Sequence, residues 1–75
     1  MNKDIIKSSD FDDYIHDEHL VININGTKRI TRHTEGIQLP NGYTELKSTY
    51  LVTSIGKIIA IGDHLHEAIK EYNKL

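Results

Sequence analysis

The clearest hydrophobic pattern is a largely β-branched run at residues 20–24, in which only Asn23 is polar, followed directly by an Asn-Gly dipeptide at 25–26. Asn-Gly favours a two-residue hairpin loop because both of its positions tolerate positive φ angles. We therefore predict a β-hairpin in which residues 27–32 return along the first strand. A two-residue loop places Val21 beside Ile30 on one face of the sheet.

Residues 33–46 lack a regular alternation of apolar and polar positions. They are mostly polar, and they contain Gly36 and the sequence Pro40-Asn41-Gly42. Proline followed by asparagine and glycine is typical of turns, because each residue suits a particular turn conformation. We predict an irregular connection over this stretch.

The C-terminal part predicts a second hairpin and a helix. Residues 49–53 and 58–61 form two further strands, and Gly56 between them can take a left-handed conformation in the turn. Apolar side chains at 65, 68, 69 and 72 then follow the spacing of one helical face. We predict a helix over residues 64–75 with Asp63 as its N-cap.

The N-terminal part carries weaker signals. Residues 1–8 show no pattern, and we expect this segment to be free to fray. Phe11, Tyr14 and Ile15 lie at i, i+3 and i+4, which indicates a short helix capped by the serine or aspartate that precedes Phe11.

Together these elements predict an α+β fold in one small domain over residues 1–75. It consists of a four-stranded antiparallel sheet of two β-hairpins, packed against a C-terminal α-helix, with a short N-terminal helix. One helix covers one face of a sheet, yet the second hairpin places apolar groups on both faces. Either the N-terminal segment or a second copy covers the other face, and we expect a homodimer.

Composition excludes several classes of protein. Hydrophobic residues make up 37% and charged residues 27% of the 75 residues, which is typical of a folded domain. Cysteine is absent, which excludes disulfides, thiolate metal sites and cysteine nucleophiles. No apolar run approaches the ~18 residues of a membrane span, and residues 1–7 have no long apolar stretch after their charges, so we do not expect them to be a secretory signal. We expect a cytoplasmic protein, and the rich use of isoleucine suggests an AT-rich bacterial genome or one of its phages or mobile elements.

The five histidines are the first candidates for metal chemistry. His16 and His19 have the spacing of one helical face, but His19 falls where the helix gives way to a strand. His64 and His66 would point apart on a helix, and His33 stands alone. We predict surface histidines, with no metal site and no cofactor.

Carboxylates gather between residues 10 and 18. Similar, solvated carboxylates lack the separated pKa values that general acid–base catalysis needs. They predict either a solubilising surface or an acidic recognition surface that docks on a basic partner. Our candidate partner-binding residues are Asp10, Asp12, Asp13, Asp17 and Glu18.

A short basic segment supports an alternative function. Lys28, Arg29 and Arg32 lie on one predicted strand, and a two-stranded ribbon can enter a nucleic-acid groove. The net charge of −2 and the lack of aromatic residues on this strand argue against it. A charged strand that discourages aggregation is the simpler interpretation.

The sequence Ile-Gly-Asp-His-Leu-His-Glu-Ala-Ile at residues 61–69 resembles the strand-to-helix step G-D-x-L-x-E-A of HicB-type antitoxins. In that family a small sheet-and-helix domain binds and blocks a partner toxin. The resemblance covers only this step, and we interpret it as shared local chemistry.

The sequence contains no nucleophile elbow and no phosphate-binding loop, so we expect no enzyme. The expected function is a small non-catalytic protein-interaction module, an accessory or inhibitory protein that binds its partner stoichiometrically. Nucleic-acid binding for regulation, through the basic strand, is the alternative.

Overall fold

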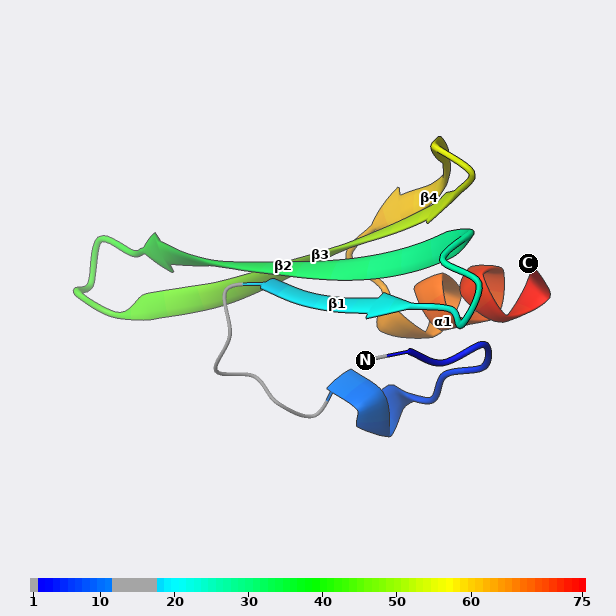
Figure 1. The fold of residues 1–75 in the computed structure, drawn as a ribbon. Coiled ribbons are helices and arrows are strands. Elements are labelled where there is room, and N and C mark those ends of the chain that lie inside the picture. Colours follow the sequence, from blue (N-terminus) through cyan, green and yellow to red (C-terminus); the bar gives the residue numbers. More distant parts are fainter. Residues whose placement is uncertain (1, 12–17) are drawn as a thin grey trace.

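The computed structural model describes residues 2–11 and 18–75 of the chain. These residues form an antiparallel sheet of four strands in the order β1-β2-β3-β4, with one α-helix after the last strand (Figure 1). The elements are η1 (Ser8–Phe11, a 3-10 helix), β1 (Glu18–Ile22), β2 (Lys28–Gln38), β3 (Thr44–Ser54), β4 (Lys57–Gly62) and α1 (Leu65–Lys74). The predicted α+β fold is confirmed. Tyr14 and Ile15, which belong to the predicted N-terminal helix, lie outside the described residues.

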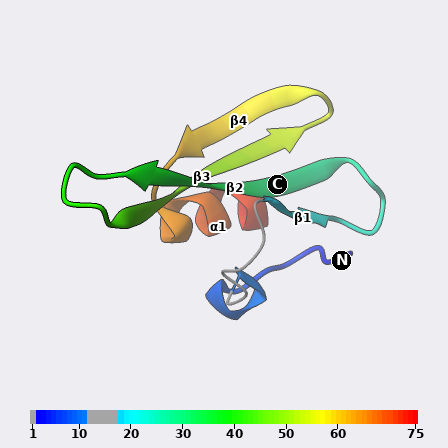
Figure 2. The ribbon, with the colours of Figure 1, turned by 90° about the vertical axis from the view of Figure 1, so that its left-hand side faces the viewer.

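Strands β2 and β3 are longer than the sequence indicates. We predicted an irregular connection over 33–46, but β2 continues to Gln38 and β3 begins at Thr44, so that prediction is wrong. The two strands form an arm that projects past α1 (Figures 1 and 2). Polar side chains pair across it, as between the hydroxyl oxygens of Thr34 and Ser48 at 3.0 Å. An arm exposed on both faces has no reason to alternate apolar and polar residues, and that alternation was the signal we used.

The first hairpin has the predicted register but a different loop. Val21 pairs with Ile30, as expected. However, the Asn23 amide donates to the Lys28 carbonyl at 3.1 Å, and the Asn23 side-chain oxygen accepts from the Lys28 amide at 3.0 Å. The loop therefore covers residues 24–27 rather than Asn-Gly alone, because the Asn23 side chain competes for a backbone donor.

The loop of the second hairpin contains an unusual backbone conformation. Gly56 has a φ of 76°, as predicted, and Ile55 before it has a φ of 50°. Among the described residues, Ile55 is the only non-glycine residue with a positive φ. A β-branched side chain is unfavourable there because its Cβ crowds the backbone. Ile55 is 81% exposed, so packing within the chain does not compensate for this strain.

Replacing Ile55 by asparagine is expected to raise the free energy of unfolding by about 1 kcal/mol, because asparagine tolerates the left-handed conformation. Urea denaturation followed by circular dichroism measures the change. Ile24→Asn is the matched control, since Ile24 is also an exposed loop isoleucine but has no positive φ. Equal effects of the two substitutions would show that lost hydrophobicity, not strain, is being measured.

The core lies on one face of the sheet. It combines residues from the N-terminal segment, the strands and α1: Ile6, Phe11, Val21, Ile30, Tyr50, Val52, Ala68 and Tyr72. The N-terminal segment therefore lies on the same face as α1 (Figure 1). For the described residues 2–11, our suggestion that this segment covers the second face is wrong, because Ile6 and Phe11 complete the core beside the helix.

Hydrogen bonds attach the N-terminal segment to the C-terminal helix. The Ile6 amide donates to the side-chain oxygen of Asn73 at 2.9 Å, and the Asn73 side-chain nitrogen donates to the Ile6 carbonyl at 3.0 Å. The Tyr72 hydroxyl donates to the Lys3 carbonyl at 2.5 Å. These contacts join segments nearly a whole chain apart, and no local pattern in residues 1–8 indicated them.

Helix α1 packs the face that its spacing predicts. Ala68 and Tyr72 are buried, and Leu65 and Ile69 are partly buried against the core. The N-cap residue is His64, and its side chain forms no capping hydrogen bond. The prediction of Asp63 as the N-cap is therefore wrong, because the helix begins one residue later than an Asp63 cap requires.

Candidate functional site

The predicted acidic surface is only partly within the described chain. Asp12, Asp13 and Asp17 lie outside the described residues. The Asp10 carboxylate accepts hydrogen bonds from Lys3 Nζ at 2.6 Å and from the Lys7 amide at 2.9 Å. The Asp10 side chain therefore stabilises the N-terminal segment by linking residues 3, 7 and 10.

Glu18, the other described member of the acidic set, is exposed at the start of β1. One of its carboxylate oxygens lies 3.6 Å from Nδ1 of His33 on the neighbouring strand. Such an exposed contact contributes little to stability and leaves Glu18 accessible to a partner.

Replacing Asp10 by asparagine is expected to reduce stability at neutral pH by about 1 kcal/mol, as the loss of a capping carboxylate does. The hydrogen bond from Lys3, together with that from the Lys7 amide, lowers the pKa of Asp10. A lowered pKa means that ionised Asp10 stabilises the fold above its unfolded pKa of about 3.9, and that this contribution is lost as pH falls through the lower folded value.

Urea denaturation at pH 7 and at about pH 2 measures this dependence on Asp10. The difference between wild type and Asp10→Asn should disappear at the lower pH. Asp63→Asn is the control, because the Asp63 side chain is 63% exposed. A difference for Asp10→Asn that is unchanged at low pH would contradict the assignment.

The three basic residues do not form one surface. Lys28 and Arg32 are buried on the α1 side of β2, whereas Arg29 is exposed on the opposite face. Lys28 Nζ donates to the Tyr72 carbonyl at 2.9 Å and lies 4.3 Å from the centre of its ring. Arg32 donates to the Phe11 carbonyl at 2.7 Å. Of the three candidate nucleic-acid-binding residues, only Arg29 is therefore exposed. Lys28 and Arg32 lie on the same face of β2 as the buried Ile30.

The histidines form no metal centre in the described part of the chain, where no group of three ligand-type side chains occurs. His16 lies outside the described residues. The His19 ring packs against the Phe11 ring at 4.9 Å between centres. His64 lies 3.4 Å from an Asp63 carboxylate oxygen at the exposed start of α1.

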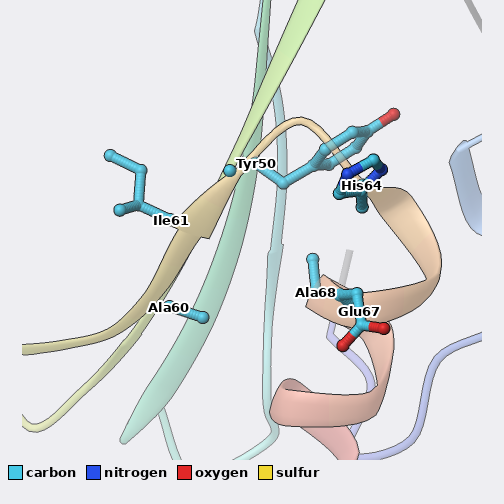
Figure 3. A pocket seen from close by; sticks show the side chains of 7 residues that line it. Tyr50, Ala60, Ile61, His64, Glu67 and Ala68 are labelled. Carbon is cyan, nitrogen blue, oxygen red and sulfur yellow. The ribbon is translucent and has the colours of Figure 1, made fainter.

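The sheet face opposite α1 is the most distinctive surface. We call it the open face, and no described element packs on it. Strand pairing arranges its side chains in two rows across the sheet: Leu20, Thr31, Leu51 and Ile61 in the first, and Ile22, Arg29, Thr53 and Ile58 in the second. Ile58 and Ile61 are each 68% exposed. Figure 3 shows Ile61 pointing away from α1, whereas Ala68 lies on the helix side of the sheet.

A hollow of about 490 Å³ lies on the open face, at the end of the sheet where two hairpin loops meet. The Ile55 amide donates to the Thr27 carbonyl at 2.8 Å and so joins the two loops. The lining residues are small or apolar apart from one cation: Gly26, Thr27, Arg29, Thr31, Leu51, Thr53, Ile55 and Gly56. Such a surface suits an apolar side chain of a partner and offers no acid–base pair.

A smaller cleft of about 240 Å³ lies between β4 and α1 (Figure 3). Tyr50 and Ala68 form its apolar wall, and His64 and Glu67 are exposed at its edge. Its volume is below the ~300 Å³ at which pockets for small molecules usually begin. The open face is therefore the better candidate site.

Comparisons with protein-family models, with curated proteins and with solved structures find no match to this chain. Among the described residues, no helix has the length and apolar character needed to cross a membrane.

Proposed function

We propose that this chain is a small non-catalytic protein-interaction module that binds a protein partner through the open face. The observation that supports this proposal is a sheet face on which no described element packs and whose outer strands carry the exposed apolar residues Leu20, Ile58 and Ile61. Apolar surface exposed to water is unfavourable by roughly 25 cal/mol per Å², so covering it favours association. Contiguous patches of this kind mark interaction sites in small proteins.

The charges on this face favour a protein over a nucleic acid as the partner. Of the three basic residues on β2, only Arg29 faces outward here. Binding to nucleic acid depends on several cations that neutralise phosphates. The open face offers Arg29 and, farther along β3, Lys47, which lies opposite the acidic Glu35. Arg29 is instead suited to the centre of a protein interface, where arginine is enriched.

Binding through the open face can be tested with the double variant Ile58→Lys/Ile61→Lys. The immobilised full chain is exposed to nuclease-treated native lysate, and self-association is measured separately by sedimentation. Wild type should retain a protein in stoichiometric amount or should self-associate, and the double variant should lose that association at least tenfold. Ile5→Lys is the matched control, since Ile5 is 62% exposed and lies in the N-terminal segment, outside the four strands.

Three results would overturn the proposal. The first is equal association of wild type and the double variant, with circular dichroism showing that both are folded. The second is a protein that is captured from untreated lysate but not from nuclease-treated lysate. The third is a chain that captures no protein and does not self-associate.

A further inference from the structure

We propose that the partner is a second copy of this chain, and that two open faces pack about a twofold axis running along the strands between β2 and β3. This inference rests on the proposed function, because it names the partner of the same face. Face-to-face sheets pack about 10 Å apart with their strands roughly 30° from alignment.

The apolar positions are complementary under this symmetry. The axis places β1 over β4 of the second copy and β2 over β3, while each row of side chains stays opposite the same row. Leu20 then meets Ile61 of the second copy, and Ile22 meets Ile58. In the centre, Thr31 meets Leu51. A twofold axis that crosses the strands at the Leu20 row would instead place the Ile22 row over the row that contains Glu18 and His33.

The charges on the β2–β3 arm favour the same twofold axis along the strands. Glu35 of β2 and Lys47 of β3 are exposed cross-strand partners on the open face. Because the axis lies between these strands, Glu35 of each copy is brought toward Lys47 of the other. Both side chains are long and flexible, so they can reach each other although the two sheets cross at an angle. The twofold symmetry forms the Glu35–Lys47 pair twice.

The strained loop and the hollow are also complementary. Ile55 extends β3 by one position and stands opposite Thr27 of the second copy, where that copy's hollow is lined by Gly26 and Gly56. Ile55 is 81% exposed at a φ of 50°, so the single chain gives no reason to keep a β-branched residue here. Insertion of the Ile55 side chain into the hollow of a second copy would explain why isoleucine is kept at this position, since strained residues are retained where function requires them.

Sedimentation equilibrium of the full chain, from about 10 µM to 1 mM, tests the inference directly. A dimer of twice the 8.6 kDa chain mass is expected, with weak, concentration-dependent affinity because the face is small. Glu35→Lys and Lys47→Glu should each weaken the dimer about tenfold, and the double exchange should restore it. Lys70→Glu on the exposed surface of α1 is the matched charge control and should leave the dimer unchanged.

Ile55→Asn adds a readout that separates binding from folding. It should stabilise the monomer against urea and yet weaken the dimer at least tenfold. A purely structural role for Ile55 would move both measurements in the same direction.

Failure of this inference differs from failure of the proposed function. A chain that stays monomeric up to 1 mM, while its open face still captures another protein, overturns only the second-copy assignment. A dimer that is insensitive to the open-face, charge-exchange and Ile55 variants uses another surface and also overturns it. A chain that neither dimerises nor captures a protein overturns both.

Discussion

Replacing Tyr72 by alanine is expected to lower the free energy of unfolding by about 3–5 kcal/mol, as the loss of a buried aromatic ring does. The Tyr72 side chain is fully buried, and its ring lies 4.3 Å below Lys28 Nζ. Its hydroxyl donates to the Lys3 carbonyl at 2.5 Å, so it also holds the N-terminal segment. Truncation would leave a cavity where α1, β2 and this segment meet.

The conservative variant Tyr72→Phe separates the ring from the hydroxyl. It removes only the hydrogen bond to Lys3 and should cost about 1 kcal/mol. Urea or thermal denaturation by circular dichroism measures both variants. A domain of this size has only about 4–11 kcal/mol of stability, so Tyr72→Ala should shift the midpoint strongly. Equal costs for the two variants would show that the ring contributes little packing.

Replacing Arg32 by alanine is expected to destabilise the fold by about 2–4 kcal/mol, because its aliphatic stem packs in the core and its guanidinium satisfies a buried carbonyl. Arg32 is 4% exposed, and its terminal nitrogen donates to the Phe11 carbonyl at 2.7 Å. Its guanidinium also lies 5.9 Å from the centre of the Phe11 ring. The variant thus loses the link between β2 and η1.

Arg29→Ala is the matched control for Arg32→Ala, since it removes the same side chain from the opposite face of the same strand. An exposed substitution of this kind usually changes stability by less than about 0.5 kcal/mol. Denaturation of the two variants under identical conditions makes the comparison. Similar losses at both positions would contradict the assignment of Arg32 to the core and Arg29 to the open face.

Local pattern predicted the elements whose side chains are half-buried. Val21 and Ile30 pair as expected, and α1 buries Ala68 and Tyr72, because alternation and helical spacing both record contact with one apolar face. The β2–β3 arm escaped prediction for the same reason. The arm is exposed on both sides, so its sequence shows no alternation of apolar and polar residues. Polar side chains pair across it instead, as Thr34 and Ser48 do.

The candidate site was predictable only in part. The apolar residues of the second hairpin indicated a sheet with two apolar faces, as the exposed Ile58 and Ile61 now show. The acidic and basic candidates were chosen by charge alone, and charge does not report burial. Lys28 and Arg32 lie inside because the carbonyls of Tyr72 and Phe11 accept their hydrogen bonds, and those partners are distant in sequence.

The sequence alone determines which side chains share a face of each strand and where the C-terminal helix lies. Both depend on local periodicity, which is two residues in a strand and about 3.6 residues in a helix. Which face is covered depends on contacts between distant segments. The Asn73 side chain binds Ile6, and the Tyr72 hydroxyl binds Lys3, so α1 and the N-terminal segment close over the same side. Because Ile6 and Phe11 are buried on that side, no described element covers Leu20 and Ile61 on the other side.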